Sequence, residues 1–68
     1  MDKYGAKLKK IRAYLDIDKN LLANFLNISE DTLTHIESGT VPLKMEYVEK
    51  ICLFYGLGFE IFFEDNLI

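Results

Sequence analysis

The stretch DKNLLANFLNISEDTLTHIESG, residues 18–39, decides the fold. It predicts two short helices joined by a tight turn, a helix-turn-helix arrangement. Asn27 lies where the chain must leave the first helix, and asparagine tolerates the left-handed conformation that such an exit needs. Ser29 offers a hydroxyl that caps the second helix, and Gly39 ends it. Ala23 is a small residue inside the first helix, where a second helix must come close.

Apolar spacing predicts further helices on both sides of this stretch. Residues 3–15 carry apolar side chains at spacings of four, three and four, which places them on one helical face: Tyr4, Leu8, Ile11 and Leu15. Residues 44–55 present a similar core-facing side: Met45, Val48, Ile51, Cys52 and Tyr55. With helices at 19–26 and 30–38, the sequence predicts an all-α fold, a compact four- to five-helix bundle in one domain, residues 1–68.

Half of the 68 residues are hydrophobic, which is a large fraction for a chain near the lower size limit for independent folding. Either the core is unusually rich or some apolar surface meets a partner. The single cysteine, Cys52, falls on an apolar helical face, so we expect a core residue in a cytoplasmic protein rather than a reactive thiol. No apolar run approaches the roughly 20 residues of a membrane span, and the start MDKYGAKLKK lacks a signal-peptide core. We expect no membrane partner.

Charge is divided unevenly along the chain, whose formal net charge is −3. Residues 1–28 carry six basic and three acidic side chains, a net charge of +3, whereas residues 29–68 carry two basic and eight acidic ones, a net charge of −6. Contacts with DNA phosphates need Lys and Arg. The first two helices therefore form the basic half, and the second helix of the helix-turn-helix belongs to the acidic half.

The order of residues resembles that of the phage-repressor and Cro-like helix-turn-helix proteins, the XRE family of small prokaryotic DNA-binding domains. The matching residues are Leu22-Ala23, Ile28-Ser29, Leu33 and Ile36-Glu37-Ser38-Gly39. The resemblance covers about residues 8–63 and implies a lambda-repressor-like fold. It also implies double-stranded DNA as the partner, with a homodimer that binds an operator and regulates transcription, most simply as a repressor.

The resemblance assigns roles to individual positions. Side chains of the helix at 30–38 that would face base edges are Glu30, Asp31, Thr34 and His35. Residues that would contact the DNA backbone are Lys7, Lys10, Lys19, Ser29, Thr32 and Lys44. Arg12 in the first helix would pair with Glu37 and tie the first helix to the third.

Simpler interpretations of these residues stay open. A row of lysines is also what a solvated helix face carries. Glu30 and Asp31 equally fit a role in stabilising the start of a helix, because the helix dipole favours carboxylates there. His35 has no second His or suitably placed Cys near it in sequence, so we expect no metal site and no cofactor.

The end of the chain carries more apolar side chains than one face of a short element can bury. In residues 57–68 these are Leu57, Phe59, Ile61, Phe62, Phe63, Leu67 and Ile68. Exposed apolar patches of this kind mark interfaces, so we predict that this segment, as a short helix or a strand, forms the homodimer contact. The alternative is a tail folded back on its own core.

The residue inventory argues against an enzyme. The chain has one His, one Cys, no glycine-rich phosphate loop and no carboxylate pair at a pocket that a chain of this size could enclose, and no small-molecule substrate is evident. A sequence-specific DNA-binding regulator is the first hypothesis. The second is a helix-turn-helix body that binds a protein partner through the acidic face of residues 30–38 or through the apolar tail, with weak or no DNA binding.

Overall fold

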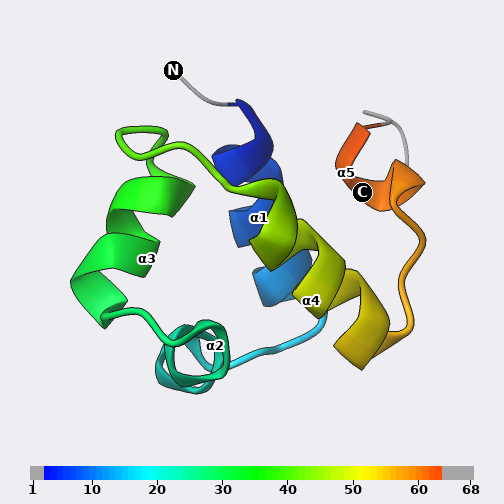
Figure 1. Cartoon of the computed structure of the whole chain (residues 1–68), viewed down its shortest axis with the longest axis horizontal. Helices are drawn as coiled ribbons and strands as arrows, with labels where there is room; N and C mark the ends of the chain where they lie inside the picture. The colour runs from blue at the N-terminus through cyan, green and yellow to red at the C-terminus, as the bar shows by residue number, and fades with distance from the viewer. Residues whose placement is uncertain (1–2, 64–68) are drawn as a thin grey trace.

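The computed structural model describes residues 3–63, and the regular secondary structure within that range is helical throughout (Figure 1). The helices are α1 (Lys3–Tyr14), α2 (Lys19–Leu26), α3 (Glu30–Glu37), α4 (Met45–Tyr55) and α5 (Glu60–Phe63). The all-α prediction is confirmed. The bounds of α2 are as predicted, and α1, α3 and α4 are each one residue shorter than predicted. The apolar tail begins with the short helix α5, while Leu67 and Ile68 lie outside the described residues.

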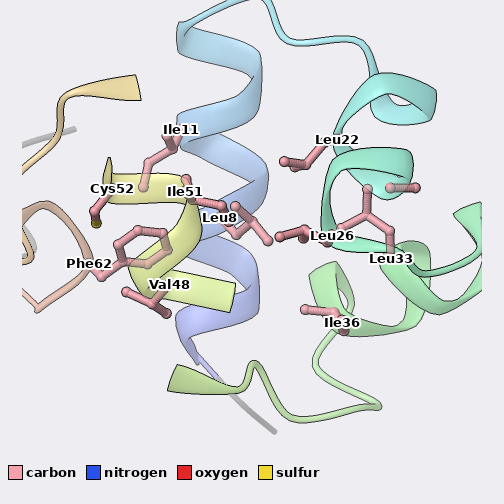
Figure 2. Close-up of a cluster of buried hydrophobic side chains, with 11 residues drawn as sticks. Leu8, Ile11, Leu22, Leu26, Leu33, Ile36, Val48, Ile51, Cys52 and Phe62 are labelled. Carbon is pink, nitrogen blue, oxygen red and sulfur yellow. The ribbon is translucent and has the colours of Figure 1, made fainter. Parts of the chain in front are cut away.

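Helices α1 and α4 lie at the centre of the molecule, with the helix-turn-helix on one side and α5 on the other (Figure 1). Helix α1 contacts both α3 and α5. Side chains from all five helices meet in one core, part of which is drawn in Figure 2: Leu8, Ile11, Leu22, Ala23, Leu26, Leu33, Ile36, Val48, Ile51, Cys52 and Phe62. Each of them is at most 5% exposed. The helix-turn-helix therefore shares its core with the rest of the chain.

Local polar contacts set the ends of α2 and α3. The Asp18 carboxylate accepts a hydrogen bond from the Asn20 N–H at 3.3 Å, which caps the start of α2. Asn27 has a φ of 61° and ends α2 in the left-handed conformation, as its residue type predicts. The Ser29 hydroxyl then accepts a hydrogen bond from the Thr32 N–H at 3.0 Å and caps α3. The turn between the two helices is thus fixed by the left-handed Asn27 and the Ser29 cap, while the Asp18 cap sets the start of α2.

Gly5 allows α1 and α3 to approach closely. A Cβ atom at this position would collide with the Ile36 carbonyl oxygen and would lie 2.9 Å from the Ile36 carbonyl carbon. Both obstacles are backbone atoms, which cannot swing aside as a side chain can. Gly5 is buried, so any larger residue must push the two helices apart.

Three sequence predictions are wrong about burial. Met45 is 55% exposed although its spacing predicts a core position; it is the first residue of α4, and the first buried residue of that helix is Val48. Lys7 is only 7% exposed although the row of lysines predicts a solvated position; α1 contacts both α3 and α5, and Lys7 is one of its buried residues. Phe62 is 2% exposed and belongs to the core, which removes it from the predicted dimer contact.

Replacing Gly5 with Ala tests the α1–α3 contact. At an exposed helical site this change stabilises a protein by about 1 kcal/mol through helix propensity. Here we expect the opposite sign, a loss of about 3 kcal/mol, because the new methyl group displaces backbone. Urea unfolding followed by circular dichroism measures the change. The reverse substitution at the neighbouring exposed residue, Ala6→Gly, calibrates the propensity effect, and stabilisation by Gly5→Ala would contradict the packing described here.

Candidate nucleic-acid interface

The outward face of α3 carries the four side chains predicted to face DNA bases. Glu30, Asp31, Thr34 and His35 are all exposed. The opposite face of α3 is buried in the protein core through Leu33 and Ile36 and through the side chain of Glu37. This polar surface is open to a ligand as large as DNA.

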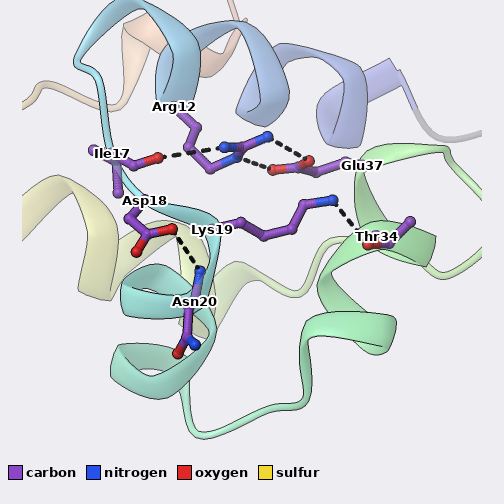
Figure 3. Close-up of polar contacts among 7 residues, drawn as sticks. All are labelled: Arg12, Ile17, Asp18, Lys19, Asn20, Thr34 and Glu37. Atoms are coloured by element: carbon purple, nitrogen blue, oxygen red, sulfur yellow. Dashed lines mark hydrogen bonds and ion pairs between the residues drawn. The ribbon is translucent and has the colours of Figure 1, made fainter.

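An ion pair between Arg12 and Glu37 anchors the C-terminal end of α3 to α1 (Figure 3). The Arg12 Nε donates to Glu37 Oε2 at 2.8 Å, and its second terminal nitrogen donates to Oε1 at 3.3 Å. Its remaining nitrogen donates to the Ile17 carbonyl oxygen at 3.3 Å. The two side chains are 18% and 4% exposed, respectively. A pair with this bidentate geometry fixes direction as well as distance, so the orientation of α3 follows from it.

Removing Arg12 should destabilise the protein strongly. Arg12→Met leaves the Glu37 carboxylate buried without its counter-ion, and we expect a loss of about 3 kcal/mol in the free energy of unfolding. The double variant with Glu37→Met should recover most of that loss, because it removes the unpaired charge as well. Urea unfolding of both variants provides the measurement, with Lys9→Met at an exposed position of α1 as the control. A single variant as stable as the control would show that the pair contributes little.

The residues predicted to contact the DNA backbone lie in several parts of the molecule. Ser29 and Thr32 are at the start of α3, where the Ser29 hydroxyl also donates to Thr32 Oγ1 at 2.9 Å. Lys7 and Lys10 line a hollow of about 340 Å³ on α1, and Lys10 is exposed while Lys7 is buried. Lys44 is exposed just before α4, with its ammonium 5.9 Å from the centre of the Tyr47 ring.

Besides Arg12, which pairs with buried Glu37, the structure brings the basic residue Lys19 to an exposed position of α3. Its Nζ donates a hydrogen bond to Thr34 Oγ1 at 2.9 Å (Figure 3). The sequence placed both residues at a DNA contact but gave no sign that they touch, because they lie 15 positions apart on different helices.

A second exposed surface, apolar in character, lies on α4 and α5. We call it the α4–α5 surface, and its exposed members are Leu53, Phe54, Phe59 and Phe63, which are 85%, 64%, 48% and 47% exposed. Along α4 and the segment that joins it to α5 runs a groove of about 600 Å³, lined by Glu49, Cys52, Leu53, Gly56, Leu57 and Phe59. The sequence predicted Phe59 and Phe63 here but missed Leu53 and Phe54. Their position off the core-facing side of α4 was the signal that could have identified them.

Cys52 lies in the wall of this groove and is a core residue, as predicted. The side chain is 5% exposed, and its thiol donates to the Gly58 carbonyl oxygen at 3.8 Å. Burial raises the pKa of the Cys52 thiol above its ordinary value, and the negative charge of Glu60 raises that pKa further. The thiol therefore stays protonated at neutral pH, and the protonated form is a poor nucleophile.

Two further findings concern other kinds of site. Within residues 3–63, no group of three or more His, Cys, Asp or Glu side chains is placed to hold a metal ion. In the same part of the chain, no helix has both the length and the apolar character needed to cross a membrane.

The fold and the exposed α3 face define a helix-turn-helix domain. The helix-turn-helix domain family matches residues 3–60, and the chain belongs to that family. It is of the Cro-like type that the sequence motifs predicted. The chain is 32% identical over 54 residues to the cryptic phage CTXphi transcriptional repressor RstR of Vibrio cholerae, an alignment that covers 79% of this chain and 49% of the relative. This chain thus spans about half the length of that relative. No solved structure matches the chain significantly.

Proposed function

We propose that this protein is a DNA-binding transcriptional regulator that recognises an operator through α3. The observation that carries the proposal is the exposed polar face of α3, held in a fixed orientation by the Arg12–Glu37 pair. A helix of this kind fits the major groove of B-DNA. Family membership and the similarity to a phage repressor support the same assignment, and repression is the simplest mode of action. Such a protein works in the cytoplasm, at the nucleoid.

The proposed DNA contacts divide into two classes. Glu30, Asp31, Thr34 and His35 face the bases, where a carboxylate accepts a hydrogen bond from the amino group of cytosine. Lys10, Ser29, Thr32 and Lys44 contact the backbone. Lys7 is a weaker candidate than the sequence suggested, because its side chain is buried.

The protein binds as a homodimer in this proposal. The α4–α5 surface supports it, because four large apolar side chains are exposed there and two of them, Leu53 and Phe59, line the groove. In Figure 1, α5 and the segment that joins it to α4 lie on the other side of α1 from α3, so a contact made there would leave α3 available in each copy. Two copies related by a two-fold axis would present two α3 helices to successive major grooves, about one helical turn apart.

Selection from a random pool of duplex DNA tests the operator assignment. We expect a palindromic motif to be enriched at about 50 mM and about 150 mM salt, because an operator bound by a symmetric dimer repeats its half-site. His35→Ala should change the base preference within each half-site. Glu46→Gln, at an exposed position on α4, should leave the motif unchanged. A pool without enrichment at either salt would contradict operator binding and favour the protein-interaction alternative.

Sedimentation equilibrium tests the dimer surface. Leu53→Glu should raise the dimer dissociation constant about tenfold or more, because it places a charge where the proposed dimer would bury a leucine. Leu21→Glu on α2, a leucine that is 64% exposed, is the matched control and should leave the dimer intact. Glu49 lines the groove and the charge of Glu60 acts on Cys52 in its wall, so higher salt should strengthen the dimer by screening like charges. Equal dissociation constants for both variants would place the dimer contact elsewhere.

A further inference from the structure

The hydrogen bond between Lys19 and Thr34 places a positive charge on the outward face of α3. Lys19 is the first residue of α2, and its side chain extends across to Thr34 in the middle of α3 (Figure 3). Thr34 is exposed and Lys19 is half-buried, so the alkyl chain is packed while the ammonium group reaches the surface. The charge therefore lies at the surface proposed to meet bases, away from the start of α2.

We propose that Lys19, held in place by Thr34, reads a guanine in the operator. This inference rests on the proposed function and deepens it, because it names a base and a residue that specifies it. The family resemblance assigned Lys19 to the DNA backbone, where it would add affinity without sequence preference. Because Lys19 contacts Thr34, we assign Lys19 to the residues that determine base specificity.

The chemistry of the pair fits the edge of guanine. An ammonium group has three N–H donors, and one of them is used on Thr34, which leaves two for a base. The major-groove edge of guanine offers two acceptors, O6 and N7. Because Thr34 Oγ1 accepts from Lys19, its own hydroxyl proton can also donate outward. The pair thus presents donors toward the groove and would be mismatched with the amino group of cytosine.

The charge of α3 gives Lys19 a further role. Residues 30–37 contain no Lys or Arg, and Glu30 and Asp31 are exposed in the first turn. Glu30 lies one helical turn before Thr34 and so shares its side of the helix. An acidic helix face entering the groove meets the negative potential of the phosphates. The Lys19 ammonium offsets that charge at the place where α3 approaches the base pairs.

Selection from a random duplex pool with matched variants tests this inference. The wild-type motif should contain a guanine at one fixed position of each half-site. Lys19→Ala should bind the guanine-containing site about tenfold more weakly and lose the preference at that position alone. Thr34→Val keeps the shape and the charge but removes the hydroxyl, so it should weaken the guanine preference without changing the salt dependence. Lys10→Ala, an exposed lysine outside the helix-turn-helix, should lower affinity equally for all sequences.

The outcomes separate this inference from the proposed function. If the wild type selects a motif and Lys19→Ala weakens every sequence equally with a shallower salt dependence, Lys19 is a phosphate contact and the inference is overturned, while operator binding stands. If the wild type selects no motif, operator binding itself fails and the inference fails with it. Circular dichroism of each variant confirms that the change in binding does not reflect unfolding.

Discussion

The contact between α1 and α3 is the constraint on which the rest of the structure depends. Gly5 lets the backbone at Ile36 lie directly against α1, and Arg12, two helical turns further along, holds the Glu37 carboxylate. Both contacts act on the C-terminal end of α3. The helix is thereby fixed at one end and its polar face is directed outward, which is the geometry that a DNA-reading helix needs.

The chain separates two kinds of surface. Helix α3, which carries the exposed polar side chains, lies on one side of α1, and α5 lies on the other (Figure 1). The net negative charge of the chain does not by itself oppose DNA binding, because the distribution of charge over the surface matters more than its sum. Lys19 is an example of this distribution. It belongs to the basic half of the sequence, residues 1–28, and its side chain donates a hydrogen bond to Thr34 in the acidic half, residues 29–68.

Local chemistry made much of this fold predictable, and tertiary packing explains what was missed. Asn27 and Ser29 determine the turn through their own backbone preferences and side-chain hydrogen bonds, so the sequence sufficed to place them. The family resemblance supplied the Arg12–Glu37 pair, which spacing alone would not have given. Gly5 was missed because its role depends on the backbone of another helix. The burial of Lys7 and Phe62 likewise depends on which helices cover them.

The salt dependence of DNA affinity tests most directly whether α3 is a DNA-binding helix. Contacts with DNA phosphates release counterions, whereas an apolar contact with a protein partner does not. With four to six phosphate contacts per dimer, the affinity for a mixed duplex should fall about 50-fold to about 400-fold between 50 mM and 150 mM salt. Fluorescence anisotropy with a labelled duplex measures this fall. Absence of binding at the lower salt, or an affinity that does not change with salt, would contradict the account of α3 as a DNA-binding helix.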